Sequence, residues 1–106
     1  MAYIYSVNFL IEPSQISQLE IGAPLERTLG YLRTLLPSSD GYISARAMYS
    51  LDDPEHIHVV FESAWVSWAN LEMHRNSGLA ENKVLVEFEP HVTLEMLSSR
   101  VYEEVS

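Results

Sequence analysis

The segment from residue 3 to residue 11 constrains the fold most, because it is apolar on both faces of the strand that it predicts. Side chains alternate between the two faces of a strand. One face carries Tyr3, Tyr5, Val7, Phe9 and Ile11, and the other carries Ile4, Ser6, Asn8 and Leu10. Because an exposed apolar sheet face is unfavourable in water, both faces must be covered. We therefore expect helices over one face and a second copy of the chain over the other.

Periodicity and turn residues place the other elements. A stripe of leucines predicts a helix across residues 14–36, interrupted at Gly22-Ala23-Pro24 and restarting at Pro24. Further strands are expected at 42–51, 56–65 and 91–97, and further helices at 67–76 and 79–88. The tail at 101–105 keeps strand-like side chains, and we expect it to reach across to a partner subunit.

This order of elements is the split βαβ arrangement. It predicts a ferredoxin-like α+β fold, in which four antiparallel strands form one sheet and the helices cover one of its faces. The 106 residues have the length of one domain, spanning 1–106. A homodimer packed sheet to sheet would form a dimeric α/β barrel with a small-molecule pocket in each subunit.

The composition narrows the partners and the location. Lys and Arg number 6 against 15 Asp and Glu, which gives a formal net charge of −9. Such a chain repels phosphate backbones and anionic membranes, so neither nucleic acid nor a membrane is expected as a partner. No apolar run approaches the roughly 20 residues of a membrane helix. The absence of cysteine and of a signal-peptide pattern predicts a cytoplasmic protein without disulfides or thiolate metal sites.

His74 and Asn8 are the candidates for chemistry. His74 follows Trp68 and Leu71 at intervals of three residues, so the three share a helix face that should point at the sheet. A histidine there can take a proton from an acidic phenol, or it can be a core residue bonded to a neighbouring group. Asn8 lies mid-strand among apolar residues, where its amide can donate to a substrate oxygen or to an adjacent side chain or buried water.

Ser6, Trp65, Trp68 and Leu71 are the expected substrate-binding residues. The face with Ser6 and Asn8 has the smaller side chains, which would leave room for a ligand beneath the helices. We therefore predict that Asn8 and His74 look into one pocket within the subunit. The two tryptophans can stack on a planar ligand or pack in the core.

Two other polar features receive plainer interpretations. His56 and His58 lie two residues apart on one strand, but no third ligand follows nearby, so no metal site is expected. Arg46 can anchor an acidic ligand or pair with Glu62 across the hairpin, and the ion pair is the preferred interpretation.

Several motifs in order resemble the antibiotic-biosynthesis monooxygenase family of dimeric α/β barrels. The resemblance rests on Gly41-Tyr42-Ile43-Ser44, on Ser50-Leu51-Asp52-Asp53-Pro54, and on Trp65-x-Ser67-x-x-x-Leu71-x-x-His74-x-x-Ser77. It implies a homodimer whose sheets face each other, with pockets between sheet and helices. It also implies oxidation of phenolic, quinol or polyketide-like substrates by dioxygen, with no metal, flavin or other cofactor.

The sequence departs from this family at two places. Many members carry a second histidine where Leu79 stands, and the haem-degrading branch has a ligand histidine around Lys83-Val84, which is absent here. Asn8 does match a polar strand residue of the haem-degrading branch. The sequence thus leaves two alternatives: a cofactor-independent monooxygenase acting on a small apolar aromatic molecule, or a non-catalytic dimer that binds a small ligand or a protein.

Overall fold

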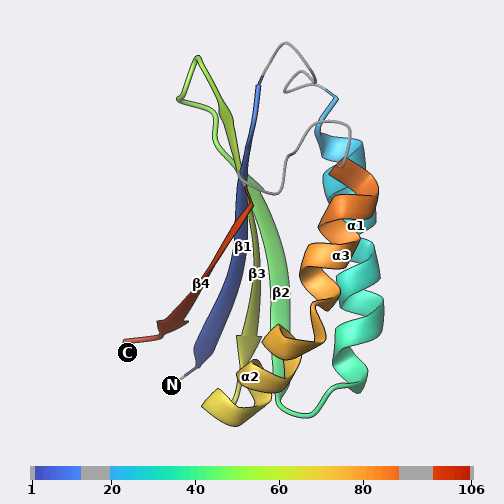
Figure 1. Cartoon of the computed structure of the whole chain (residues 1–106), viewed down its shortest axis with the longest axis vertical. Helices are drawn as coiled ribbons and strands as arrows, with labels where there is room; N and C mark the ends of the chain where they lie inside the picture. The colour runs from blue at the N-terminus through green and yellow to red at the C-terminus, as the bar shows by residue number, and fades with distance from the viewer. Residues whose placement is uncertain (1, 13–19, 89–96, 106) are drawn as a thin grey trace.

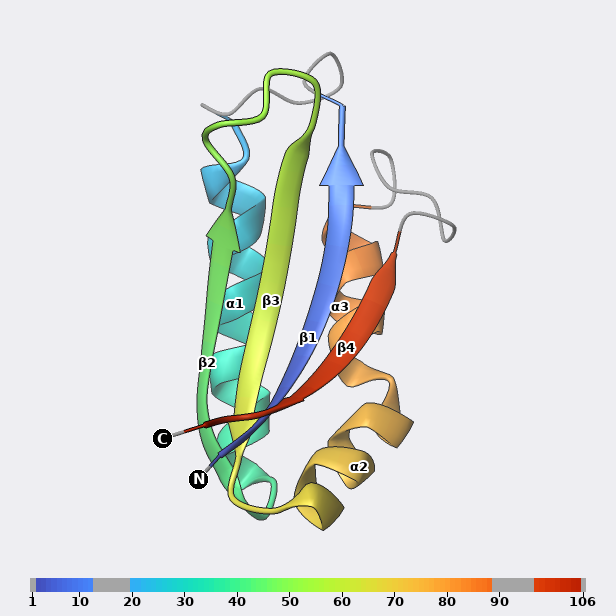
Figure 2. The ribbon, with the colours of Figure 1, turned by 90° about the vertical axis from the view of Figure 1, so that its left-hand side faces the viewer.

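A four-stranded antiparallel sheet with helices on one face forms the fold, as the sequence predicts. The computed structural model describes residues 2–12, 20–88 and 97–105. The elements are β1 (Tyr3–Ile11), α1 (Gly22–Leu35), the 3-10 turn η1 (Leu36–Ser38), β2 (Tyr42–Tyr49), β3 (Ile57–Trp65), α2 (Trp68–Ser77), α3 (Leu79–Phe88) and β4 (Ser98–Glu103). The strand order is β2-β3-β1-β4 (Figures 1 and 2). This is the ferredoxin-like α+β class.

The position of the last strand differs from the prediction. The fourth strand was expected at 91–97 and a partner-reaching arm at 101–105, whereas β4 spans Ser98–Glu103. Residues 91–96 lie outside the described part of the chain, as do residues 14–19 of the expected first helix. β4 pairs with β1 of its own chain, with Ile4 opposite Tyr102. The arm prediction is therefore wrong, because the strand-like residues of the tail complete the edge of the subunit's own sheet.

Local signals explain where α2 begins and ends. The Ser67 hydroxyl accepts a hydrogen bond from the backbone N–H of Asn70 at 3.2 Å, which caps the first turn of the helix. Gly78 takes the left-handed conformation at φ 67° and ends the helix, because this conformation is costly for residues with a Cβ. α2 thus holds His74 in its last turn, at a fixed height above the sheet.

The bulky face of β1, with Tyr5, Val7, Phe9 and Ile11, packs against the helices. All four side chains belong to the buried core. The ring of Phe9 lies 5.0 Å from that of Phe88 on α3, centroid to centroid. We predicted the opposite arrangement, with the Asn8 face beneath the helices, and that prediction is wrong. The large side chains bury more apolar area against the helices than Ser6 and Asn8 would, and this favours the observed orientation.

Within the described residues, no helix covers the other face of the sheet, and we call it the open face (Figure 2). Strand register aligns Arg46, Glu62, Ser6 and Arg100 in one row across all four strands. The next row aligns Met48, Val60, Asn8 and Ser98. Nε of Arg46 lies 2.9 Å from the Glu62 carboxylate, which confirms the predicted cross-hairpin ion pair.

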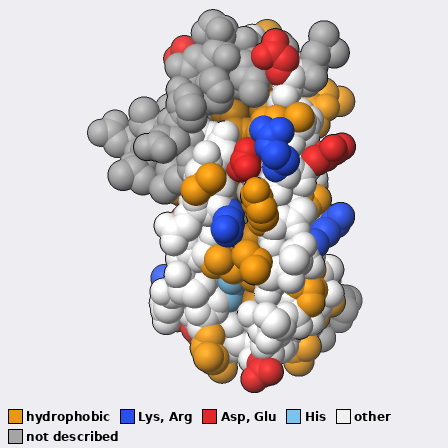
Figure 3. All heavy atoms as spheres, turned by 90° about the vertical axis from the view of Figure 1, so that its right-hand side faces the viewer, with side chains coloured by type: hydrophobic (Ala, Val, Ile, Leu, Met, Phe, Trp, Pro, Cys, Tyr) orange, Lys and Arg blue, Asp and Glu red, His pale blue; other side chains and the backbone are white. Residues whose placement is uncertain are grey.

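The helical layer presents mixed chemistry to solvent (Figure 3). Arg27 of α1 pairs with Glu87 of α3 at 2.9 Å, and the Lys83 ammonium lies 5.0 Å from the ring centroid of Tyr31. Hydrophobic side chains are also exposed on this layer, and Val86 of α3 is 71% exposed. No helix in the described residues is long and apolar enough to cross a membrane.

Candidate functional site

His74 lies at the junction between the sheet and α2, with its side chain almost enclosed. The residue is 7% exposed. Its imidazole stacks on the indole of Trp65, with 4.8 Å between ring centroids and 24° between ring planes. The ring of Tyr5 on β1 makes a T-shaped contact with it, at 5.5 Å between centroids and 85° between ring planes. Two aromatic rings from neighbouring strands therefore fix the orientation of the imidazole.

A cavity of about 330 Å³ opens beside this imidazole. Its walls include Trp65 and His74, the apolar Met73 and Leu79, and the polar Asp40, Asn70, Ser77 and Asn82. Its volume lies at the lower end of the range for small-molecule pockets, which is about 300–1,000 Å³. It lies within the subunit, on the helical side of the sheet. A compact small molecule would fit this volume.

Hydrogen bonds fix two residues of the cavity wall. The indole Nε1 of Trp65 donates to the Ser63 hydroxyl at 2.9 Å, which prevents rotation of the fully buried ring. The Ser67 hydroxyl donates to Oδ1 of Asn70 at 2.6 Å. Gly41 packs so tightly against Asn70 that an added Cβ would lie 2.7 Å from the Asn70 Cβ. This part of the wall is preorganised before any ligand arrives.

Burial lowers the pKa of His74 from its ordinary value of 6.5, and the negative charge of Glu81 opposes this shift. The ring is therefore neutral at pH 7 and can accept a proton. Among the described residues, no hydrogen bond engages its ring nitrogens. The Ser77 hydroxyl donates instead to the backbone carbonyl of His74, at 2.6 Å. His74 thus has the protonation state and the free nitrogen that a general base requires.

Below His74, the hydroxyl of Tyr5 donates a hydrogen bond to Oε1 of Glu81 on α3. Burial, reinforced by this bond, raises the pKa of Tyr5 to about 12, so the phenol keeps its proton and remains a donor. Oε2 of Glu81 is buried without a hydrogen-bond partner among the described residues. A carboxylate and a phenol therefore lie close to the imidazole on its inner side.

The predicted site residues separate into three groups. His74 and Trp65 line the cavity together. Leu71 is fully buried in the core, and Trp68 is 49% exposed with its edge against Tyr3 at 6.1 Å.

Asn8 and Ser6 form the third group, and they lie on the open face, across the sheet from His74. There Nδ2 of Asn8 donates to the Ser6 hydroxyl at 3.0 Å. The prediction that Asn8 and His74 share one pocket is therefore wrong. A separate hollow of about 570 Å³ on the open face contains Asn8, with Leu10, His58, Val60, Ser98 and Arg100 around it.

Sequence reasoning missed Asn70, Asn82, Tyr5 and Glu81. Asn70 precedes His74 by four residues on one helix, a spacing that places both on the same face and was available as a signal. Asn82 and Glu81 lie beyond the break at Gly78, so helical spacing from His74 does not reach them.

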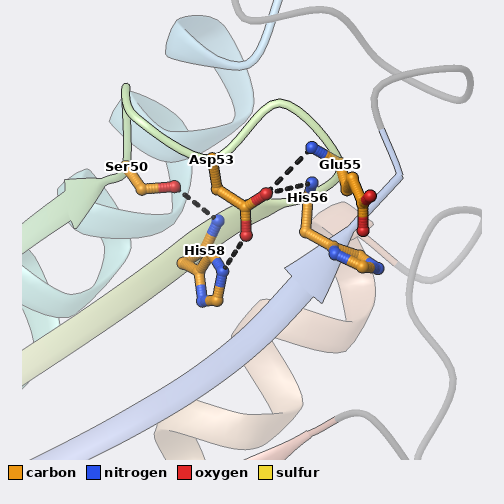
Figure 4. Close-up of polar contacts among 5 residues, drawn as sticks. All are labelled: Ser50, Asp53, Glu55, His56 and His58. Atoms are coloured by element: carbon orange, nitrogen blue, oxygen red, sulfur yellow. Dashed lines mark hydrogen bonds and ion pairs between the residues drawn. The ribbon is translucent and has the colours of Figure 1, made fainter.

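Of the two histidines of the β2–β3 hairpin, His56 lies in the turn and His58 lies in β3, and Asp53 of the turn contacts both (Figure 4). Oδ1 of Asp53 accepts hydrogen bonds from the backbone N–H groups of Glu55 and His56, at 2.8 and 3.2 Å. Its Oδ2 lies 2.7 Å from Nε2 of His58. The bond from the Glu55 N–H and that from His58 lower the pKa of Asp53 below 3.8. In the described ranges, no cluster of three or more potential ligands could hold a metal.

Comparison with known proteins identifies the fold. No family model matches the chain, and no curated protein matches its sequence. A crystal structure of an antibiotic biosynthesis monooxygenase is 22% identical, with full coverage of both chains and a TM-score of 0.59. Rv0793 from Mycobacterium tuberculosis is 20% identical over 100% of this chain and 97% of its own, with a TM-score of 0.61.

A third solved structure carries a stated activity. SnoaB, a cofactor-independent oxygenase from Streptomyces nogalater, is 8% identical over 99% of this chain and 94% of its own, with a TM-score of 0.61. At these identities the likeness concerns the fold. The chain thus has the fold of proteins described as antibiotic biosynthesis monooxygenases, in agreement with the resemblance read from its sequence.

Proposed function

We propose that this protein is a cofactor-independent monooxygenase that oxidises a small, flat phenol or quinol with dioxygen in the cavity beside His74. One observation carries the proposal: a buried, neutral imidazole with unengaged ring nitrogens forms the wall of a cavity, stacked on Trp65. The fold shared with a cofactor-independent oxygenase supports the same reaction class.

The chemistry requires little from the protein beyond a base and a dry pocket. His74 takes the phenolic proton, and the resulting anion gives one electron to dioxygen. The substrate radical and superoxide then combine at a ring carbon, forming a C–O bond, and the peroxide takes the proton back from His74. Loss of water breaks the O–O bond, removes the hydrogen of that carbon and leaves a quinone. One oxygen atom enters the product and the other enters water.

Asn70 and Asn82 replace Asn8 as the expected donors to oxygen. Both line the cavity, whereas Asn8 lies across the sheet. A side-chain amide can donate to a phenolate oxygen, which stabilises the anion and favours its formation. The apolar Met73 and Leu79 complete the wall of the cavity.

The proposed working unit is a homodimer assembled through the open face. Apolar side chains on this face include Ile4, Leu10, Met48, Val60 and Tyr102, and none of the helices that the structure describes covers them. A second sheet packed against them would remove this apolar area from water. A standard interface buries about 1,600 Å² in total.

One observation favours a second candidate function, a non-catalytic ligand-binding dimer. Leu79, where many relatives of the resembled family carry a second histidine, lines the cavity. His74 is then the only histidine among the described residues that line it. A pocket with one base can bind a phenol without oxidising it.

Oxygen uptake separates the two functions. Purified protein is incubated with a panel of naphthols, anthrones and quinols, and uptake is compared between the wild type and His74→Gln. The monooxygenase proposal expects uptake with at least one substrate, reduced at least about a hundredfold in the variant. Binding of the phenols without oxygen uptake establishes the second candidate instead. Equal uptake in both proteins contradicts the role of His74.

A further inference from the structure

Three elements bring ionisable side chains together on the inner side of His74. Tyr5 comes from β1, His74 from α2 and Glu81 from α3. Tyr5 contacts both of the others, through a T-shaped ring contact with His74 and through its hydroxyl toward Oε1 of Glu81. The cavity is lined by His74 but by neither Tyr5 nor Glu81. Any effect of Glu81 on a ligand there would therefore pass through His74.

One carboxylate oxygen of Glu81 has no hydrogen-bond partner among the described residues. Oε1 accepts from Tyr5, whereas Oε2 is buried and has no hydrogen-bond partner in the described part of the chain. A buried carboxylate oxygen without a partner is uncommon in folded proteins, because burial removes its water without replacement. A positive charge formed nearby would compensate for that loss. The protonated form of His74 is such a charge.

The other charged groups near His74 are differently engaged. Arg75, its neighbour on α2, pairs with Glu72 at 3.1 Å. Glu62 of β3 borders the small space that also contacts Tyr5 and His74, but its carboxylate pairs with Arg46 on the open face. Asp40 lies in the wall of the ligand cavity. The negative charge of Glu81 raises the pKa of His74, and this opposes the lowering of that pKa by burial.

We propose that Glu81 is a positioning residue, held by Tyr5, whose buried Oε2 stabilises the imidazolium formed when His74 takes a proton from a ligand. This inference rests on the proposed function of the cavity. The proton moves from the ligand hydroxyl to one ring nitrogen of His74. The other ring nitrogen keeps its hydrogen, and the negative charge of Glu81 stabilises the resulting imidazolium through space. Tyr5 remains neutral and serves only to fix the carboxylate.

A titration of His74 in the free protein tests this without any substrate. The imidazole signals are followed by NMR against pH in the wild type, in Glu81→Gln and in Glu87→Gln. Glu87 lies on the same helix and pairs with Arg27, so its substitution removes one negative charge from α3 away from Tyr5. The expected result is a lower pKa of His74 in Glu81→Gln and little change in Glu87→Gln. Equal shifts in the two variants, or none, overturn the inference.

A second measurement needs no variant, in case Glu81→Gln does not fold. In the wild type, the side-chain carboxyl carbon of Glu81 should change its chemical shift at the pH where His74 titrates. A Glu81 chemical shift that does not change at the pH where His74 titrates also overturns the inference. Where oxygen uptake is found, Glu81→Gln should lower the maximal rate about tenfold and move the acidic limb of its pH profile downward, while Glu81→Asp should restore part of both.

The outcomes of these tests separate the inference from the proposed function. Coupling of Glu81 to His74 without oxygen uptake leaves the inference standing and rejects the oxygenase. Oxygen uptake that depends on His74 but not on Glu81 supports the oxygenase and rejects the inference about Glu81.

Discussion

The imidazole of His74 lies nearly parallel to the indole of Trp65, at 4.8 Å between centroids. Trp65 is fully buried and its Nε1 is bonded to Ser63, so the indole is a fixed surface against which the imidazole is held. The Tyr5 ring limits the remaining freedom of the imidazole. The imidazole is thus oriented by side chains of β1 and β3, while α2 supplies it. The core packing that stabilises the fold therefore also fixes the orientation of His74 in the cavity wall.

Protonation of His74 should destabilise the fold. Burial lowers its folded-state pKa below 6.5, so the unfolded chain binds more protons in the pH range just below that value. The stabilising contribution is complete above 6.5 and is lost as the pH falls. Urea unfolding between about pH 7.5 and about pH 5.5 should show a steeper loss of unfolding free energy in the wild type than in His74→Gln. His56→Gln, at the hairpin, is the control, and an unchanged slope in His74→Gln would falsify the assignment.

Gly41→Ala should destabilise the protein and disturb the cavity wall. Gly41 has φ 81°, and a Cβ there would collide with the Asn70 side chain. The expected loss is about 1–3 kcal/mol of unfolding free energy, measured by denaturation. Gly30→Ala is the matched control, because a Cβ on Gly30 meets nothing within 4 Å. That change, in the middle of α1, should stabilise by about 0.5–1 kcal/mol. Equal effects of the two substitutions would contradict the conformational argument.

Ser63→Ala should be costly although it removes one oxygen atom. The indole N–H of Trp65 would lose its acceptor inside the core. An unsatisfied buried donor costs about 1–3 kcal/mol, which thermal or urea unfolding can resolve. Ser38→Ala, at an exposed position of the 3-10 turn η1, should change the stability by less than about 0.5 kcal/mol. If Ser63→Ala is as mild as Ser38→Ala, the hydrogen bond does not hold the indole.

Val60→Asp should dissociate the proposed dimer without unfolding the subunit. Val60 lies on the open face between Asn8 and Met48, where a charge would have to be buried against the second sheet. Light scattering should report a dimer for the wild type and a monomer for the variant. Val86→Asp places the same charge on the solvent side of α3 and should remain dimeric. A monomeric wild type at micromolar concentration rejects the dimer outright.

Local sequence determined β1, α2 and the β2–β3 hairpin, but not the position of β4. Alternation defined β1, Ser67 and Gly78 bounded α2, and the polar Asp53 turn joined β2 to β3. These features depend on neighbours along the chain, which periodicity and capping chemistry describe. The same reasoning placed His74 on a face turned toward the sheet, where its contacts with Trp65 and Tyr5 lie.

Only the tertiary structure decided which face of β1 lies under the helices. Alternation places Asn8 and Phe9 on opposite faces of the strand, but it does not show which face the helices cover. Both faces of this strand are largely apolar, so composition does not decide it either. Packing against α3 settled the matter in favour of the bulkier face, which moved Asn8 to the open face and away from His74. The meeting of Tyr5 with Glu81, 76 positions apart in the chain, likewise depends on how α3 packs on β1, and no local pattern encodes that packing.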